Sequence, residues 1–483
     1  GNQNTKAVSA RIRFDAAPGF GAPDLPSGPV TVTLAPGTEL RAPDALEFLR
    51  AQGLSIPQAS SSSPIAGSLS VAADDATEGL YAIARTYTGD SAGTYGLFYE
   101  GPSDLEAAEE EAAVYGLRSV AGVSRSNLAV AALPGRDSGP ITLQVQVYAA
   151  SGAVVGSPLS KTLQPGEWYQ WNGILALAGL GDGSYGYAKI TRVAGSSPWA
   201  AYGVVNDAAT SDGSYLPAFR LGGASGSRTV VVPVVLDVYG SAGSHFTTEL
   251  TLVNDGLFAT QVALTYKPAP GFGSSGGVPN VLVSMGARAQ QTIPDVLQYL
   301  RDFGVTIPDG STGPQAGTLT VEFRYPTSVD SARTLALART STPNPDASAR
   351  GSFGLFYASV PRGAGAKTSA LVPALTQDSS VRSNLAVVNL GGGSEKAITL
   401  SVQLYAASTG AKVGQALSIS LLPGEWYQWS RILELAGAIS TTSKAVAVVT
   451  RVAGDDTFFA YGVLNDAVTS DGSFLKMIPG DAY

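Results

Sequence analysis

Hydrophobic and polar residues alternate with a period of two along much of this chain. In the segment ITLSVQLY, the apolar residues Ile398, Leu400, Val402 and Leu404 alternate with Thr, Ser and Gln. A strand with this pattern buries one face and exposes the other. Segments rich in Gly, Ser, Asn and Asp separate such strands roughly every ten residues. The pattern predicts antiparallel β-sandwiches of the immunoglobulin type, with about seven strands and 100 residues each.

One stretch follows a helical period instead. Val296, Leu297 and Leu300 are three or four positions apart, which places them on one face of a helix. Pro294 suits the first helical turn, where a missing N–H has no cost, and Gly304 suits the left-handed position that ends a helix. Similar patterns occur at 42–57, 174–178 and 432–436. We therefore expect a short helical crossover between the two sheets of each sandwich.

Internal repeats define the organisation of the chain. The segments YGVVNDAATSDGSYL at 202–216 and YGVLNDAVTSDGSFL at 461–475 are identical at 12 of 15 positions. PGEWYQW and RSNLAV also occur twice, at similar offsets. The chain thus contains two units of roughly 250 residues, and each unit divides into halves with the same order of elements. We predict an all-β protein of four tandem immunoglobulin-like sandwiches, with domains at 1–113, 114–222, 223–369 and 370–483.

The first predicted domain lacks a segment that the third one has. Residues 230–252 have no counterpart before Gly1, which aligns with Val253. A sandwich without these strands has an unpaired edge and an uncovered core. Two explanations remain open: the chain is cut from a longer one, or a neighbouring chain donates the strand and a homopolymer results. In the second case we expect the edge between chains at Ala7, Ser9, Arg11 and Arg13.

Composition excludes several kinds of chemistry. Charged residues make up only 14% of the 483 residues, the net charge is −8, and the chain has no Cys and one His. Without Cys, disulfides, thiolate metal sites and cysteine nucleophiles are excluded. The negative net charge disfavours nucleic acid as a partner. No apolar run reaches the 18 or so residues of a membrane span, and a lack of Cys is compatible with export.

The repeated motifs resemble a known but largely uncharacterised repeat. The segments VVLDVYGSAGSHFTTELTLVN, IPDVLQYLR, RSNLAVVN, LPGEWYQW and AYGVLNDAVTSDGSF together are similar to a repeat in large secreted or surface proteins of bacteria. The resemblance covers nearly the whole chain. It implies an exported tandem array of immunoglobulin-like domains, and it implies no catalytic residue and no cofactor.

Two repeated loops bring acidic side chains together. The loops NDAATSDGS and NDAVTSDGS each contain two carboxylates, and these are weak candidates for a calcium site: Asp207, Asp212, Asp466 and Asp471. Calcium favours more carboxylates than two in one loop. Hydrogen bonds within Asx turns explain the same residues, and we favour that interpretation.

The motif EWYQW forms the densest aromatic cluster of the sequence. On a strand, successive side chains alternate between the two faces, so one face is core. The other face is either a contact between domains, which we favour, or a platform for glycans or another ligand. The residues concerned are Trp168, Tyr169, Trp171, Trp426, Tyr427 and Trp429.

One histidine and four recurring arginines are the remaining polar candidates. A triad needs one histidine per site, so the lone His245 is expected to be a surface or capped histidine. Arginines recur at equivalent strand positions, and we expect them to brace contacts between domains rather than to bind a substrate; they are Arg85, Arg192, Arg339 and Arg451.

Repetition without a catalytic set predicts a structural role and no enzyme activity. The leading hypothesis is an extracellular or cell-surface array that forms a fibre, sheath or filament, with copies of itself as partners. The alternative is an adhesin or a carbohydrate-binding stalk. The sequence leaves open the assembly symmetry, the true chain ends, any ligand and glycosylation.

Overall fold

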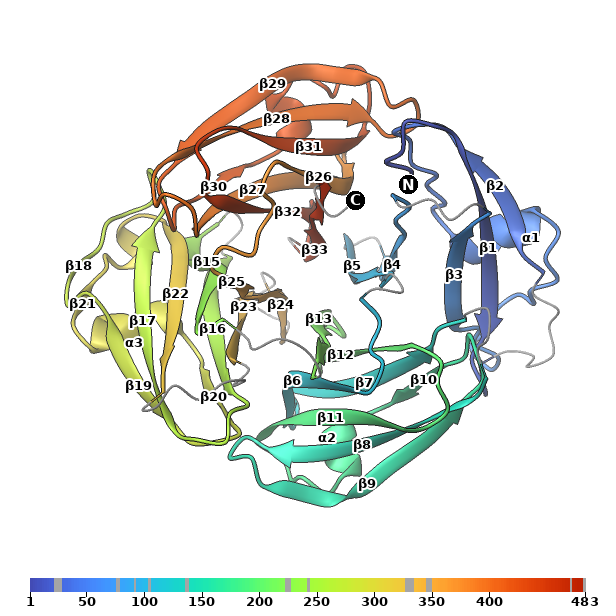
Figure 1. Ribbon diagram of the computed structural model, residues 1–483, viewed down its shortest axis with the longest axis horizontal. Helices are drawn as coiled ribbons and strands as arrows, with labels where there is room; N and C mark the ends of the chain where they lie inside the picture. The colour runs from blue at the N-terminus through green and yellow to red at the C-terminus, as the bar shows by residue number, and fades with distance from the viewer. Residues whose placement is uncertain are drawn as a thin grey trace.

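The computed structural model of the chain is all-β, with a few short helices (Figure 1). Its strands form four groups that we call blocks: block 1 contains β1–β5, block 2 β6–β14, block 3 β15–β25 and block 4 β26–β34. The structure describes residues 1–20, 28–74, 79–90, 93–102, 106–134, 139–221, 227–240, 244–325, 334–344, 350–469 and 471–480.

Block 4 has two antiparallel sheets that share one hydrophobic core. The outer sheet has the order β29-β28-β31-β26-β34, and the inner sheet has the order β30-β27-β32-β33. The alternation predicted for β28 is confirmed, because its four apolar side chains are at most 1% exposed. The bounds are β26 Ser369–Thr376, β27 Val381–Gly391, β28 Ile398–Ala406, β29 Lys412–Leu421, β30 Trp426–Trp429, β31 Lys444–Ala453, β32 Thr457–Asp466, β33 Gly472–Lys476 and β34 Ile478–Pro479.

Block 2 repeats this order of strands. Its outer strands pair as β9-β8-β11-β6-β14, and its inner strands pair as β10-β7-β12-β13. The bounds are β6 Glu111–Val120, β7 Ser124–Ala132, β8 Ile141–Ala149, β9 Val154–Leu163, β10 Trp168–Trp171, β11 Ser184–Ala194, β12 Trp199–Asp207, β13 Gly213–Pro217 and β14 Phe219–Arg220.

Block 3 follows the same plan, with the outer order β19-β17-β22-β15-β25 and the inner order β20-β16-β23-β24. A further pair, β18 and β21, lies outside these sheets. The bounds are β15 Thr229–Tyr239, β16 His245–Asn254, β17 Thr260–Pro268, β18 Gly276–Gly277, β19 Val281–Met285, β20 Ala289–Ile293, β21 Val305–Thr306, β22 Gln315–Arg324, β23 Thr334–Pro343, β24 Ser352–Ala358 and β25 Val360–Pro361.

Block 1 is smaller than the others. It contains a three-stranded sheet, β2-β1-β3, and a separate pair, β4-β5. These strands correspond to β19-β17-β22 and β23-β24 of block 3, so counterparts of β15 and β16 are missing among the described residues. Among its described residues, the core cluster contains four buried side chains: Phe14, Val30, Leu49 and Ile56. The bounds are β1 Val8–Ala16, β2 Val30–Leu34, β3 Gly67–Ala73, β4 Ile83–Asp90 and β5 Gly93–Glu100.

The open edge of block 1 is not at β1. That strand pairs with β2 on one side and with β3 on the other. The absent strands would neighbour β3 and β4 instead. The edge that we expected at four residues of the first strand region is therefore misplaced; these residues are Ala7, Ser9, Arg11 and Arg13.

Among the described residues each block has one short α-helix, but the predicted crossover between two sheets is absent in block 1, where the helix connects β2 and β3 of the same sheet. The helices are α1 Ala45–Ala51, α2 Ile174–Leu177, α3 Val296–Asp302 and α4 Ile432–Leu435. In block 4, α4 follows β30 of the inner sheet and precedes β31 of the outer sheet, so it crosses between them. No helix in the described parts of the chain is both long enough and apolar enough to cross a membrane.

The longest helices follow the predicted pattern with one difference at the start. Val296, Leu297 and Leu300 are fully buried, and Gly304 has a φ of 93°, both as expected. The N-cap, however, is Asp295, whose carboxylate accepts from the third residue of the helix. Pro294 therefore precedes the cap instead of lying in the first turn.

The four blocks close around a common centre (Figure 1). Strand β5 of block 1 contacts β13 of block 2 and β33 of block 4, and β24 of block 3 contacts the same two strands. The first and last blocks are therefore neighbours.

Two strands begin close to predicted domain boundaries. Strand β6 begins at Glu111, three residues before the boundary at 114, and β26 begins at Ser369, one residue before the boundary at 370. The boundary between 222 and 223 lies outside the described residues.

Candidate functional site

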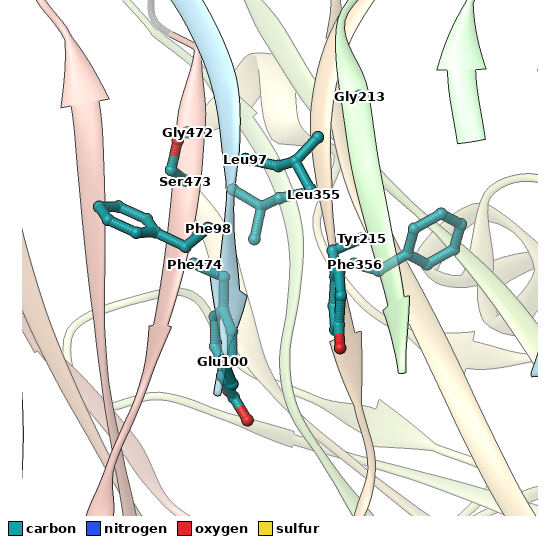
Figure 2. Close-up of a pocket in the computed structure, with 10 residues that line it drawn as sticks. All are labelled: Leu97, Phe98, Glu100, Gly213, Tyr215, Leu355, Phe356, Gly472, Ser473 and Phe474. Atoms are coloured by element: carbon teal, nitrogen blue, oxygen red, sulfur yellow. The ribbon is translucent and has the colours of Figure 1, made fainter. Parts of the chain in front are cut away.

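Four short strands surround the centre of the molecule: β5, β13, β24 and β33 (Figure 2). The cavity between them measures about 30 Å³, which is room for a single water molecule. Its lining is Leu97, Phe98, Glu100, Gly213, Tyr215, Leu355, Phe356, Gly472, Ser473 and Phe474. The described residues of these four strands thus form a packed junction at the centre.

Two glycines let leucines from neighbouring blocks reach this centre. A Cβ atom on Gly213 would lie 2.5 Å from Leu97 of block 1, and a Cβ atom on Gly472 would lie 2.5 Å from Leu355 of block 3. Such distances are shorter than real Cβ contacts, so a larger residue would require the leucine side chain to move. The Gly of each SDGS motif therefore leaves room for a leucine of a neighbouring block.

The acidic residues of the first TSDGS loop bind the backbone of another block. The carboxylate of Asp207 accepts hydrogen bonds from the N–H and hydroxyl of Ser352, at 2.9 and 3.0 Å. The carboxylate of Asp212 accepts from the N–H of Gly354 at 3.0 Å. Because Ser352 and Gly354 belong to β24, these bonds join block 2 to block 3.

The second copy of the loop joins block 4 to block 1 in the same way. The carboxylate of Asp466 accepts from the N–H and hydroxyl of Thr94, at 2.8 and 2.7 Å. The carboxylate of Asp471 accepts from the N–H of Gly96 at 2.9 Å. Both partners lie on β5, so this loop closes the circle of blocks.

Hydroxyl groups of the loops complete each contact by donating to carbonyl groups of the same strand. The pairs are Thr210 with Ser352, Ser214 with Gly354, Thr469 with Thr94 and Ser473 with Gly96, at 2.7 to 3.1 Å. Side chains thus satisfy both the N–H and C=O groups of a strand edge, as a neighbouring strand would. We call the eight loop residues the clamps: Asp207, Thr210, Asp212 and Ser214, with Asp466, Thr469, Asp471 and Ser473.

Each clamp also contains the Asx turn that the sequence predicts. The second oxygen of Asp207 accepts from the N–H groups of Ala209 and Thr210. That of Asp466 accepts from Val468 and Thr469. No group of three or more His, Asp or Glu residues that could hold a metal ion occurs among the described residues. The four aspartates are therefore placed as hydrogen-bond acceptors.

The pKa values of the two carboxylates in each clamp are shifted in opposite directions. Burial opposes ionisation of Asp207 and Asp466, but hydrogen bonds from N–H and hydroxyl groups outweigh it and lower the pKa of both. Burial raises the pKa of Asp212 to about 6 and that of Asp471 to about 8, and each has one buried oxygen without a hydrogen-bond partner. The negative charge of Asp212 adds to the shift at Asp471.

Two of the four repeated arginines lie beside the clamps. Arg85 of block 1 donates to the hydroxyl of Ser473 at 3.2 Å, and Arg339 of block 3 donates to that of Ser214 at 3.3 Å. Burial lowers the pKa of Arg339 to about 10. These two arginines contact a neighbouring block, as expected. Arg192 and Arg451 instead donate to carbonyl groups of loops in their own blocks.

The first tryptophan of each EWYQW motif lies at the other two junctions. Trp168 donates its indole N–H to the hydroxyl of Tyr202 at 2.9 Å, and its ring lies 6.2 Å from that of Phe20 in block 1. Trp426 repeats this geometry in block 4, with Tyr461 at 2.8 Å and Phe272 of block 3 at 5.8 Å between ring centres.

The opposite face of the motif belongs to the cores. Trp171 and Trp429 are 7% and 6% exposed and lie in the main clusters of blocks 2 and 4. Tyr169 and Tyr427 are half-buried, and each contacts the tryptophan two residues later at about 5 Å between ring centres. One face of the motif is thus core and the other contacts a neighbouring block.

A further pair of junction residues has no sequence motif. Gly116 and Ala374 both have a positive φ at a bulge, and their N–H groups point out of the ladder. The N–H of Gly116 donates to Gln290 of block 3, and that of Ala374 donates to Glu39 of block 1, both at 3.1 Å. The alignment pairs Glu39 with Gln290, but nothing in the sequence marks them as contacts.

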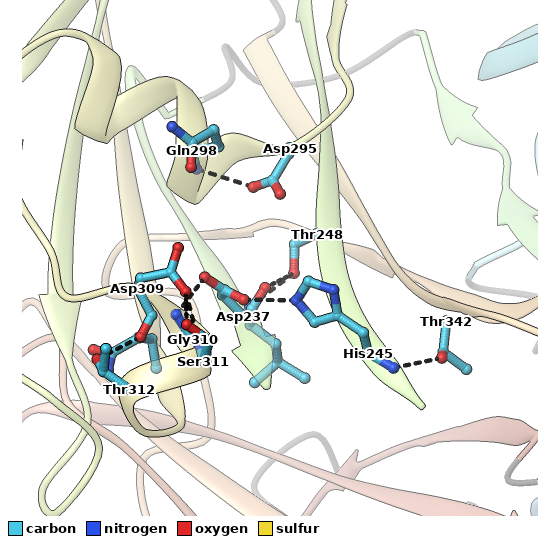
Figure 3. Close-up of polar contacts among 12 residues, drawn as sticks. Asp237, His245, Thr248, Asp295, Gln298, Asp309, Gly310, Ser311, Thr312 and Thr342 are labelled. Atoms are coloured by element: carbon cyan, nitrogen blue, oxygen red, sulfur yellow. Dashed lines mark hydrogen bonds and ion pairs between the residues drawn. The ribbon is translucent and has the colours of Figure 1, made fainter. Parts of the chain in front are cut away.

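The lone histidine has a structural partner (Figure 3). Nε2 of His245 lies 2.9 Å from Asp237, and the ring stacks on Tyr239 at 3.9 Å between centres. Asp237 is also paired with Arg301 at 2.6 Å and accepts from the N–H of Gly310. The histidine is capped, as predicted, and its carboxylate partner serves to hold β15 against α3.

Comparison with known proteins adds no function to this geometry. No protein-family model matches the chain, and no curated protein matches it.

Proposed function

We propose that this protein is a structural building block, without enzyme activity, of an extracellular fibre, sheath or other surface assembly. The observation that carries the proposal is the use of the repeated motifs. The clamps, the SDGS glycines and the first tryptophan of each EWYQW motif all contact a neighbouring block. Residues repeated in this way serve cohesion between blocks.

The fold that we propose is four copies of one immunoglobulin-like sandwich, the first copy lacking two strands. The shared order of outer and inner strands in blocks 2, 3 and 4 supports it. A low charged fraction of 14% also suits a protein with much internal contact surface, because fewer ions lose their hydration. Export is proposed from the resemblance to secreted bacterial repeats and from the absence of Cys.

Immunogold electron microscopy of native material tests the proposed role. Antibodies raised against the purified chain are expected to label a regular fibre or sheath at the cell surface. Labelling confined to the cell interior would contradict the proposal, and so would turnover of a substrate by the purified chain.

A further inference from the structure

Each clamp has one aspartate that is shut off from solvent beside the central strands. Asp212 is 1% exposed and Asp471 is 0% exposed. One oxygen of each carboxylate accepts from a glycine N–H, and the other oxygen is buried without a hydrogen-bond partner among the described residues. A charged carboxylate in such a place loses hydration that no donor replaces, so the protonated form is favoured.

The positive charges nearby do not balance these carboxylates. Arg339 of β23 faces Asp212, and Arg85 of β4 faces Asp471, but each arginine donates its hydrogen bond to the serine of the clamp. The two clamps together hold four carboxylates beside these two arginines.

The other charged groups around the two aspartates add little positive charge. Strand β24 carries no charged residue. Two further ion pairs balance themselves: Arg118 of β6 with Glu249 of β16 at 2.8 Å, and Glu100 with Lys476, the last residues of β5 and β33, at 3.4 Å. The outer aspartates of the clamps, at the ends of β12 and β32, bring negative charge only; they are Asp207 and Asp466.

Strand β5 connects the clamp that holds it to the other clamp. Asp471 accepts the hydrogen bond of Gly96 on this strand. The next residue, Leu97, packs against Gly213, which directly follows Asp212 in the chain (Figure 2). A movement of β5 away from the centre therefore breaks the bond to Asp471 and also uncovers Asp212.

Strand β24 makes the reciprocal connection. Asp212 accepts the hydrogen bond of Gly354 on this strand. The next residue, Leu355, packs against Gly472, which directly follows Asp471. A movement of β24 therefore releases Asp212 and uncovers Asp471, so neither junction opens without exposing the buried carboxylate of the other.

Titration of these two groups favours the closed arrangement at low pH. Burial raises the pKa of Asp212 to about 6 and that of Asp471 to about 8, and the charge of Asp212 adds to the shift at Asp471. A hydrated aspartate titrates near 4. Because both values are raised in the folded protein, the stabilising contribution is complete below about pH 4 and is lost as pH rises through about 6 and 8.

We propose that Asp212 and Asp471 form one proton-dependent latch at the centre of the molecule. With both carboxylates protonated, the junction between blocks 2 and 3 and the junction between blocks 4 and 1 are closed. Loss of both protons to water leaves two like charges in a space without solvent, and the two junctions open together so that water reaches both groups. The latch acts within one chain, so it does not depend on the proposed location at the cell surface.

Hydrogen exchange of the purified full chain between pH 5 and pH 9 tests the latch. Protection factors, corrected for the intrinsic pH dependence of amide exchange, are expected to fall at least about tenfold in β5 and in β24. Strand β28 in the core of block 4 is expected to keep its protection. Constant protection of β5 and β24 would overturn the proposal, and so would an equal loss in β28, which would indicate global unfolding.

A variant of one clamp tests whether the two clamps are linked. Asp471→Asn removes one titration and keeps an oxygen that accepts from Gly96, and it is expected to lose most of the pH response in β24 as well as in β5. Asp212→Asn is expected to weaken the response in β5, although its own bond is to β24. The matched control is Asp302→Asn, at an exposed carboxylate of α3, with an unchanged response. A response that changes only in the strand bound by the substituted aspartate would contradict a shared latch.

Discussion

At the scale of single residues, aspartates accept the hydrogen bonds that a neighbouring strand would otherwise accept from a strand edge. An unpaired N–H group that is buried costs free energy, so each strand edge needs an acceptor. Asp207 and Asp466 supply it to β24 and β5 while also closing their own turns. A carboxylate in that setting is stabilised in its charged form, which is why the pKa of both is lowered.

Removing such an acceptor destabilises the closed arrangement. Asp466→Ala leaves the half-buried N–H group of Thr94 and the buried N–H group of Thr469 without this acceptor, and we expect a loss of about 1–3 kcal/mol in the free energy of unfolding. Urea denaturation measures it. The control Asp302→Ala removes an exposed carboxylate of α3 and is expected to change stability little. Equal stability of the two variants would show that the clamp has no role in cohesion.

The second carboxylate of the clamp, Asp471, has a raised pKa, so its effect on stability has the opposite pH dependence to that of a carboxylate with a lowered pKa. The pKa of Asp471 is raised in the folded protein to about 8, whereas an unfolded aspartate titrates near 4. The unfolded state therefore loses this proton first, and the contribution of Asp471 to stability falls as pH rises from about 4 to about 8.

Asp471→Asn removes that titration and retains an oxygen that accepts from Gly96. We expect the variant to gain stability relative to the natural protein as pH rises through this interval. Denaturation at pH 5 and pH 8 measures the change. A constant difference between the two proteins at both pH values would contradict the assigned role of burial.

At the scale of elements, the two faces of the WYQW strand make different contacts. The face of Trp171 and Trp429 fills a core, and the face of Trp168 and Trp426 meets the preceding block. Alternation along a strand predicts this division, but it does not say which face is core. Which face is core depends on the position of the neighbouring block, and the local sequence pattern carries no information about that position.

A hydroxyl group accepts a hydrogen bond from the indole of the junction tryptophan. Tyr461→Phe would leave the buried indole N–H of Trp426 without its acceptor, and we expect a loss of about 1–3 kcal/mol. Tyr405→Phe, at a half-buried position of β28, is the matched control and is expected to cost less. Thermal unfolding of both variants measures the two losses of stability. A larger loss for Tyr405→Phe than for Tyr461→Phe would rule out the hydrogen bond as a stabilising contact.

Much of the element level could be predicted from the sequence. The alternation in β28, the buried face of α3 and the left-handed Gly304 follow from local periodicity and backbone sterics, which neighbouring residues determine. The contact between Ala374 and Glu39 could not be predicted, because it depends on how two distant blocks meet. The misplaced edge at Arg11 has the same origin, since the alignment shows that strands are missing but not which neighbours they leave.

At the scale of the whole molecule, the tandem repeats close around a common centre. The hydrogen bonds between block 4 and block 1 are of the same kind as those between block 2 and block 3, which are consecutive in the sequence. Arg41 donates to the carbonyls of Leu375 and Ala445, at 3.2 and 2.9 Å, and the N–H of Glu39 donates to Ala407. Gln290 makes a comparable bond to Gly186 between blocks 2 and 3. The same kind of junction thus occurs twice, once within the sequence and once between its ends.

The distance between the first and last blocks tests closure most directly. Glu100 of β5 and Lys476 of β33 form a partly exposed ion pair at 3.4 Å across this junction. The chain has no Cys, so cysteines placed at these two positions can carry spin labels without further changes. Pulsed electron paramagnetic resonance is expected to give a single narrow distance in the shortest range that the method resolves. A broad distribution centred beyond roughly 60 Å, the span of two intervening blocks with strands of about ten residues, would contradict the closed arrangement.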